Sequence, residues 1–177
     1  MRRLKLDLSE LVLAFEDASL EIDRFLDLET GQVIIMTDEI REELNKIYTK
    51  VYSKSAEELM LFDEALRQRN LPDWEQEMLI EADQVEQGFG ERYIRVPKAD
   101  TREAYQDMEV FIETVADARL ANLLERVIRG RGAFRRFKGL LDDHRRERER
   151  WFAFKDARLR QRVFEWLAEE EIEVVEE

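Results

Sequence analysis

The chain has a single histidine, His144, which is the first candidate for acid–base chemistry. Asp142 and Asp143 are its neighbours in sequence but do not share a helical face with it, whereas Glu147, three positions further on, does. Acid–base catalysis needs such groups within hydrogen-bonding reach of a substrate. A solvated histidine in a charged turn explains the same pattern. We therefore assign no catalytic residue, and the sequence favours a protein without enzymatic activity.

Carboxylates in a predicted hairpin could bind a divalent cation. Asp23 and Asp27 point to the same face of one strand, Glu29 follows in the turn, and hard cations prefer carboxylate ligands. Phe25 lies between the two aspartates on that face, which suits a partly covered surface equally well. We therefore assign no metal ligand and no cofactor. The absence of cysteine excludes disulfides and thiolate chemistry.

The densest cluster of cations lies between residues 131 and 150, in a chain whose net charge is −13. From Arg126 to Arg162 there are 14 Lys or Arg and 5 Asp or Glu, a local excess of nine positive charges. Guanidinium groups bind phosphates through paired hydrogen bonds, and nearby aromatic rings can stack on bases. The candidate anion-binding residues are Arg131, Arg135, Arg136, Lys138, Arg145, Arg146, Arg148 and Arg150. The alternative is that acidic parts of the same fold neutralise them.

Three predicted helices carry and flank this cluster. The apolar spacing between residues 120 and 128 predicts a helix that stops at Gly130, and Gly132 precedes a short helix. Phe134, Phe137 and Leu141 share one face of that short helix. The last helix, from about Glu147, has one stripe of Phe152, Leu159, Val163, Trp166 and Leu167 and a second of Phe154, Ala157 and Phe164. A helix that is apolar on two faces is typical of one wedged between layers, so we predict that Phe152 and Trp166 are buried.

The N-terminal part predicts a short helix followed by a small sheet. Asp7 begins the helix, and residues 22–28 alternate as a strand. The turn at 29–31 leads into Val33–Met36, which is apolar on both faces and so is predicted to be covered on both sides. Residues 92–96 are the candidate third strand and residues 172–175 the candidate fourth, at the edge.

The middle of the chain predicts three helices. Asp38 starts the first, Ser55 and Glu58 form a capping box for the second, and Pro72 begins the third, which carries Trp74 and runs to Gly88. Asp100 and Asp117 cap two further helices. The predicted fold class is α+β and predominantly helical, with about seven helices on an antiparallel sheet of three or four strands.

Several blocks together resemble a bacterial family known as uncharacterised protein family 0158. They are FLDLETGQVI, ERYIRVP, AYQDMEVFIETV, GRGAFRRFKGLL and ERERWFAFKDARLRQRVFEWL, in this order. The resemblance covers roughly Leu4 to Met36 and Glu91 to Leu167. It implies one compact domain over 1–177, in which the helical layer 38–90, where the resemblance is weaker, is a variable insertion. Independently of the resemblance, this layer has apolar residues off its buried stripes, which makes it a candidate surface for pairing with a second copy. It implies no activity and no catalytic residues.

The functional prediction is macromolecular binding without catalysis, as a protein-interaction or regulatory module whose protein partner the sequence does not identify. A phosphate- or nucleic-acid-binding module built on residues 131–150 is the alternative, which the overall negative charge disfavours because it repels nucleic acid at long range. A metal- or carboxylate-dependent enzyme is the second alternative. No stretch is long and apolar enough to cross a membrane, and the N-terminus is broken by charges, so we expect a cytoplasmic protein.

Overall fold

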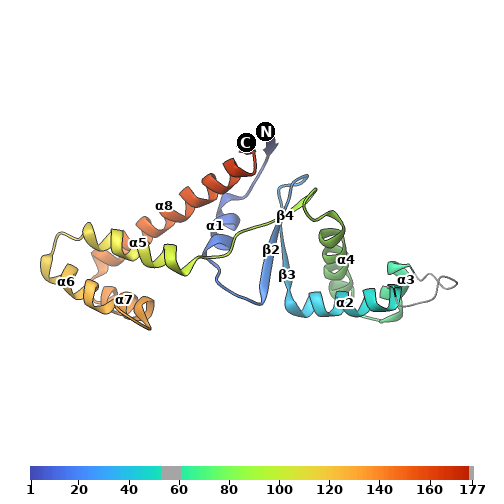
Figure 1. Ribbon diagram of the computed structural model, residues 1–177, viewed down its shortest axis with the longest axis horizontal. Helices are drawn as coiled ribbons and strands as arrows, with labels where there is room; N and C mark the ends of the chain where they lie inside the picture. The colour runs from blue at the N-terminus through green and yellow to red at the C-terminus, as the bar shows by residue number, and fades with distance from the viewer. Residues whose placement is uncertain (53–60, 176–177) are drawn as a thin grey trace. The chain divides into compact units, whose positions relative to one another are not determined.

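The computed structural model describes residues 1–52 and 61–175 (Figure 1). In chain order the elements are β1 (Arg2–Leu4), α1 (Leu8–Glu16), β2 (Ile22–Asp27), β3 (Val33–Thr37), α2 (Asp38–Tyr52), α3 (Phe62–Gln68), α4 (Asp73–Gly88), β4 (Tyr93–Arg95), α5 (Thr101–Glu113), α6 (Ala118–Val127), α7 (Ala133–Asp142), α8 (Arg145–Glu169) and β5 (Ile172–Val174). The predicted class, a mainly helical α+β protein, is confirmed. Among the described residues, none of the helices has the length and apolar character needed to cross a membrane.

Contacts within the chain divide it into two compact units, each with its own core. The hairpin unit consists mainly of Ser19–Pro97, and the helical unit mainly of Leu8–Ala18 and Lys98–Glu173. The expectation of a single domain over 1–177 with a variable layer at 38–90 stays a prediction.

The three predicted strands of the hairpin unit form one antiparallel sheet in the order β3-β2-β4. Phe25 on the central strand pairs with Ile34 of β3 and with Arg95 of β4. Gly31 closes the hairpin with a φ of 77°, and a Cβ at this position would collide with the carbonyl oxygen of Lys5. Both facts restrict this turn position to glycine.

Two details of the sheet differ from the prediction. Ile35 of β3 is 48% exposed while Met36 is buried, so β3 is covered on the face that packs on the helices and not on both faces. The predicted C-terminal strand forms as β5, but it pairs with β1 in a separate two-stranded sheet. Because β1 has only three residues, it has no alternating pattern by which the sequence could reveal it as a partner.

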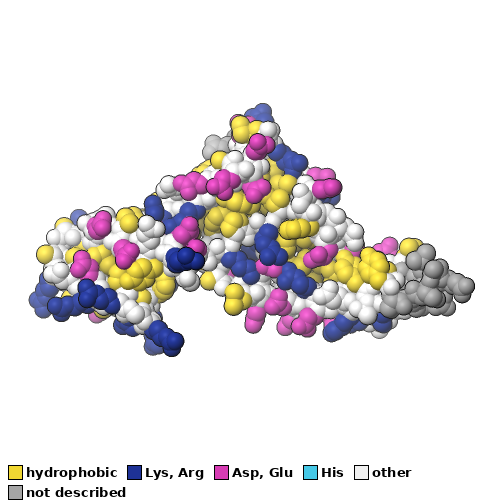
Figure 2. Space-filling model, viewed as in Figure 1, with side chains coloured by type: hydrophobic (Ala, Val, Ile, Leu, Met, Phe, Trp, Pro, Cys, Tyr) yellow, Lys and Arg dark blue, Asp and Glu magenta, His cyan; other side chains and the backbone are white. Residues whose placement is uncertain are grey.

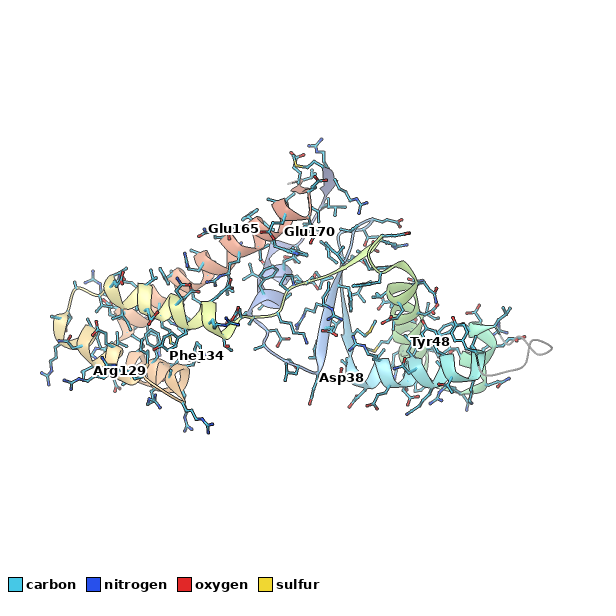
Figure 3. All side chains as sticks on the ribbon, viewed as in Figure 1. Asp38, Tyr48, Arg129, Phe134, Glu165 and Glu170 are labelled. Atoms are coloured by element: carbon cyan, nitrogen blue, oxygen red, sulfur yellow. The ribbon has the colours of Figure 1, made fainter. Side chains whose placement is uncertain are left out.

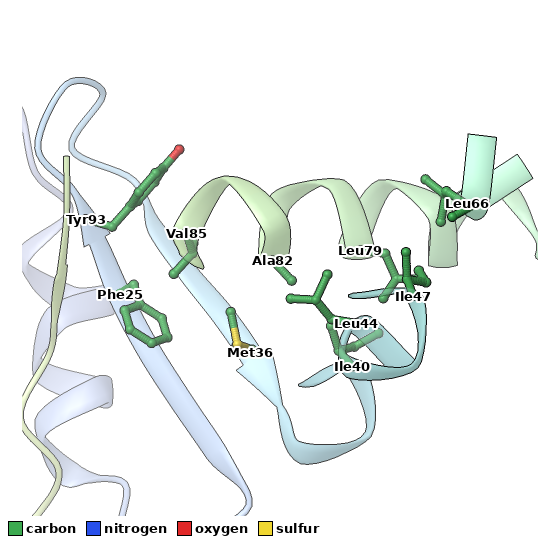
Figure 4. Close-up of a cluster of buried hydrophobic side chains, with 11 residues drawn as sticks. Phe25, Met36, Ile40, Leu44, Ile47, Leu66, Leu79, Ala82, Val85 and Tyr93 are labelled. Carbon is green, nitrogen blue, oxygen red and sulfur yellow. The ribbon is translucent and has the colours of Figure 1, made fainter. Parts of the chain in front are cut away.

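Helices α2, α3 and α4 complete the hairpin unit. They share an apolar core with the sheet, and α3 packs against α2 (Figure 4). Its buried members are Phe25, Met36, Ile40, Leu44, Ile47, Ala65, Leu66, Leu79, Ala82, Val85 and Tyr93. The Tyr48 hydroxyl (labelled in Figure 3) donates a hydrogen bond to Asp83 Oδ1 at 2.7 Å and so links α2 to α4. Burial, and then the hydrogen bond to the Asp83 carboxylate, raises the pKa of the Tyr48 hydroxyl, which keeps this donor protonated.

The helices predicted around Pro72 are present with different boundaries. The structure describes α3 from Phe62, and the predicted capping box of Ser55 and Glu58 lies outside the described residues. The helix predicted from Pro72 forms as α4, with Pro72 at its N-cap. Trp74 lies on this helix as predicted, and it is 61% exposed.

A second core holds α5, α6, α7 and α8 of the helical unit together. Its buried members are Met108, Phe111, Ile112, Val115, Leu120, Leu124, Ile128, Ala133, Phe137, Leu141 and Trp151. The carboxylates of Asp100 and Asp117 cap α5 and α6 as predicted, each accepting a hydrogen bond from a backbone N–H of the first turn. Helix α1 packs on α8, where the ring centroids of Phe15 and Trp166 are 5.6 Å apart.

The apolar stripes on α7 and α8 were partly misassigned. Trp166 is buried as predicted, but Phe152 and Phe164 are each 49% exposed, so α8 is not wedged between two layers. On α7, Phe134 is 40% exposed and Ala133 joins Phe137 in the core instead. Helix α8 has aromatic residues on several faces, so the spacing of its apolar residues does not show which face is buried.

Candidate anion-binding surface

Arginine side chains neutralise the hairpin carboxylates that could have bound a cation. Asp27 is buried and accepts hydrogen bonds from Nε and Nη2 of Arg92 at 3.1 and 2.7 Å, and from the backbone N–H of Glu29 at 2.8 Å. Burial by itself would raise the pKa of Asp27, but the hydrogen bonds from Arg92 and from the turn outweigh it and lower this pKa. Asp27 is therefore an ionised carboxylate that joins β2 to the start of β4.

Asp23, the second hairpin aspartate, has the same type of partner. Its Oδ2 accepts a hydrogen bond from Nη2 of Arg41 at 2.6 Å, and Nη2 of Arg95 is 3.6 Å away. Among residues 1–52 and 61–175, no three or more His, Asp or Glu residues form a group that could hold a metal ion. The geometry gives both aspartates the role of fixing β2 to its neighbours.

His144 lies at the N-cap position of α8, between α7 and α8. Its backbone N–H donates to the Leu141 carbonyl, and its carbonyl accepts from the N–H of Arg148, each at 2.9 Å. Glu147, the acidic residue on its helical face, forms an ion pair with Arg150. These backbone hydrogen bonds give His144 a structural role in the connection between α7 and α8.

Carboxylates neutralise much of the C-terminal part of the predicted basic block. The ion pairs are Arg145–Glu149, Arg148–Asp142 and Arg150–Glu147. Arg150 also donates to the Thr114 side chain at 2.8 Å and lies over the ring of Phe111, 5.4 Å from its centroid. Arg150 thus fastens α8 to α5, whereas Arg146 is exposed and makes no ion pair with a described residue.

Arg136 has a structural position within the same block. Its guanidinium donates to three carbonyl oxygens at the end of α6 and in the turn that follows: Val127 (2.8 Å), Arg129 (2.7 Å) and Arg131. The last carbonyls of a helix have no partner within the helix, so cations commonly satisfy them. Gly130 and Gly132, with φ of 78° and 77°, let the turn fold around this side chain. Arg136 therefore fixes α7 relative to α6.

Three further members of the predicted set point to solvent from the turn and from α7. Arg131, Arg135 and Lys138 are exposed, and none forms an ion pair with a residue that the structure describes. Figure 2 shows Lys and Arg side chains gathered over α6 and α7. This cluster is the only part of the predicted block in which several neighbouring cations lack a carboxylate, within the described residues.

Sequence reasoning missed the cations that extend this surface toward α6. Arg119 and Arg126 lie on the exposed face of α6, and Arg129 (labelled in Figure 3) lies in the turn. None of the three forms an ion pair with a residue in the described ranges. The signal was available, because positions 119 and 126 are two helical turns apart and both lie opposite the buried Leu120 and Leu124. We call Arg119, Arg126, Arg129, Arg131, Arg135 and Lys138 the α6–α7 surface.

The α6–α7 surface is electrostatically one-sided. From Ala118 to Leu141 the chain carries seven Lys or Arg and a single Glu, an excess of six positive charges. Guanidinium groups present planar pairs of donors that match phosphate oxygens, and they remain charged at every physiological pH. Phe134, 40% exposed at the start of α7, adds a partly apolar contact beside these cations. The α6–α7 surface thus presents several hydrogen-bond donors with positive charge, and its six residues include no group that could act as a nucleophile or a general base.

Fold and surface together describe a mainly helical α+β protein with a cationic two-helix surface. The chain belongs to the Uncharacterised protein family (UPF0158), whose family model matches residues 68–177. The matched range includes the whole α6–α7 surface. It also includes α4, which the sequence analysis placed in the variable part, and it leaves out the β2–β3 hairpin. Searches among curated proteins and among solved structures gave no match.

Proposed function

We propose that this protein is a non-catalytic binding module whose α6–α7 surface binds the phosphate groups of a nucleic acid. The observation that carries the proposal is the difference between two groups of cations in the same sequence block. Arg145, Arg148 and Arg150 have carboxylate partners, whereas Arg131, Arg135 and Lys138 have none among the described residues. Uncompensated cations on neighbouring helices repel one another, and an anionic partner relieves that repulsion.

The negative charge of the whole chain does not decide against this proposal. At physiological ionic strength, charges more than about 8 Å apart are largely screened from each other. A bound phosphate is therefore governed by the charges beside it, which on the α6–α7 surface are positive. The acidic remainder lowers the rate of encounter more than the strength of the contact, because encounter depends on the long-range field.

Rigidity of the surface supports the same proposal. Arg136 holds the turn between α6 and α7 through three backbone carbonyls, and Phe137 and Leu141 anchor α7 in the core. The cations therefore project from a fixed scaffold, which reduces the conformational entropy that binding must overcome.

Protein interaction is the second candidate function, and the exposure of Trp74 on α4 favours it. A tryptophan that is 61% exposed is the type of residue that dominates the centre of protein interfaces. If the hairpin unit pairs with a second copy through α4, sedimentation should show a concentration-dependent dimer that Trp74→Ala abolishes. A monomer at all concentrations would remove this candidate.

Fluorescence polarisation with labelled RNA and DNA tests the proposed function. Binding should weaken steeply with salt, and neutralising about four phosphates gives a log–log slope near −3 on a single strand or −3.5 on a duplex. Arg135→Glu should weaken binding to all sequences alike, because phosphate contacts carry no sequence information.

Arg102→Glu is the matched control for this experiment. It makes the same change of charge on an exposed arginine of the helical unit. Arg102 lies in the first turn of α5, and α6 follows the other end of that helix. The control should bind nearly as well as the natural chain. Equal losses for both variants, or no binding at low salt, would contradict the proposed function.

A further inference from the structure

The middle of α7 contains a glycine that the fold itself does not require. Gly139 is exposed and lies three residues before the end of the helix. Its φ is not in the left-handed region, and a Cβ placed on it would meet no atom within 4 Å. Glycine weakens a helix interior relative to alanine, because it loses more conformational freedom on folding. Packing within the described chain therefore gives no reason for the absence of a side chain.

Gly139 lies on the same side of α7 as the uncompensated cations. Arg135, one helical turn earlier, and the adjacent Lys138 are exposed with it, whereas Phe137 and Leu141 face the core. The outer face of α7 thus has a bare stretch of main chain at Gly139, beside two cationic side chains. Such a stretch lets the backbone of a partner come closer to the helix than any side chain would allow.

The cations of the α6–α7 surface form two rows rather than one. Arg119 and Arg126 project from α6, and Arg135 and Lys138 project from α7, which packs against α6. The axes of packed helices are about 8–10 Å apart, so cations that project in parallel from the two helices are separated by roughly that distance. The two phosphate backbones that border the major groove of a duplex are about 12 Å apart, whereas a single strand offers only one row of phosphates.

We infer that the partner is a double-stranded nucleic acid whose two phosphate rows lie over α6 and α7, with its closest approach to the protein main chain at Gly139. This inference rests on the proposed function, because it names the kind of nucleic acid and the point of contact. The inference gives Gly139 a role in binding that a residue with a side chain could not have, because a side chain would keep the phosphates away from the helix. Phe134, which lies at the edge of the exposed face of α7, then borders the contact and does not stack on bases.

A comparison of duplex and single-stranded probes tests the kind of partner. The full chain is titrated by polarisation with a labelled duplex and with each of its strands, at equal length and salt. The duplex should bind at least about tenfold more tightly, because it satisfies both rows of cations. Equal or tighter binding of the single strands, weakened further by Phe134→Ala, would overturn the inference in favour of base stacking.

Substitutions at Gly139 test the point of closest approach. Gly139→Ala and Gly139→Leu should both raise the Tm, by about 1–4 °C, because alanine and leucine are better helix formers than glycine. Both should weaken duplex binding, about threefold for alanine and about tenfold for leucine, because added carbons hold the phosphates away from the helix. Stabilisation and loss of binding in the same variant would be hard to explain by misfolding.

The outcomes separate the two proposals. A higher Tm with unchanged duplex affinity in both Gly139 variants would overturn the close approach while leaving the proposed function intact. A natural chain that binds neither duplex nor single strand at low salt would overturn both. Gln106→Ala, an exposed change on α5 that alters no charge and lies outside the α6–α7 surface, is the matched control and should change affinity less than twofold.

Discussion

In the hairpin unit, Arg41 and Arg92 lie against the buried carboxylates of Asp23 and Asp27, whereas Arg135 and Lys138 of the helical unit face solvent without a carboxylate. The composition differs in the same sense. Ser19–Pro97 carries nine Lys or Arg and 19 Asp or Glu, and Ala118–Leu141 carries seven Lys or Arg and one Glu. Where acids are in excess, arginines such as Arg41 and Arg92 pair with carboxylates and hold the fold together. Where acids are scarce, cations such as Arg135 and Lys138 face solvent.

The helical unit contains both kinds of cation, which makes it the place to test this comparison. Asp107 of α5 is buried, and both Arg158 and Arg162 of α8 donate to it, at 2.9 Å and at 2.7 and 2.8 Å. These arginines join two helices just as Arg92 joins two strands. Arg158 and Arg162 are therefore structural cations, which hold the fold together. They lie on α8, the helix that directly follows α7 of the α6–α7 surface.

The largest effect should come from Asp107→Ala, which leaves Arg158 without its acceptor and Arg162 with Glu103 alone. Removing one partner of a buried ion pair costs about 3–5 kcal/mol, and the partial exposure of Arg158 places the expected loss near 3 kcal/mol. Urea unfolding measures it. Asp142→Ala, which removes the exposed partner of Arg148, is the control and should cost less than about 0.5 kcal/mol. Similar losses for both would break the distinction between structural and surface pairs.

A smaller effect, confined to a pH window, should come from Asp27→Asn. The pKa of Asp27 is lowered in the folded protein, so its charge stabilises the fold fully above its unfolded pKa, about 3.9. That stabilisation is lost as the pH falls through the lower folded value. The variant should therefore unfold at lower urea than the natural chain at pH 7, and the two midpoints should approach each other as the pH falls below the unfolded pKa of about 3.9. A difference that persists unchanged at pH 3 would show that the Asp27 charge is not responsible.

The smallest effect on stability should separate Arg136 from Arg135. Arg136→Ala leaves three carbonyls to water and should cost about 1 kcal/mol, because each exposed hydrogen bond is replaced by one to solvent. Arg135→Ala should change the free energy of unfolding by less than about 0.5 kcal/mol. Binding should show the reverse order, with the greater direct loss for Arg135→Ala. If Arg135→Ala were the more destabilising of the two, Arg135 would belong with the structural cations.

Local signals in the sequence predicted most elements of the fold. The caps at Asp100 and Asp117, the turn at Gly31 and the strand around Tyr93 each depend on a few adjacent residues, and all are present. The pairing of β5 with β1 joins the two ends of the chain, and no short-range pattern encodes it. The exposure of Phe152 could not be predicted either, because helical periodicity shows which residues share a face but not which face is covered.

The candidate surface could likewise be predicted only where it depends on local sequence. The excess of positive charge near residue 131 is visible in the sequence, but which arginines are neutralised depends on neighbours brought together by folding. Arg136 looks identical to Arg135 in the sequence and differs only in lying close enough to the end of α6 to reach its carbonyls. The contribution of Arg119 is not visible in the densest run of arginines, because Arg119 lies on the helix that precedes that run.

An amide and arginine side-chain NMR titration of the full chain would show which cations a nucleic acid contacts. Adding a short duplex at low salt should shift the signals of residues 118–142, with the arginine Nε–H signals of the α6–α7 surface among the largest changes. The Nε–H signals of Arg92 and Arg158 should stay in place, because their carboxylate partners hold them. Shifts concentrated outside residues 118–142, or shifts of the paired arginines as large as those of Arg131 and Arg135, would contradict the account.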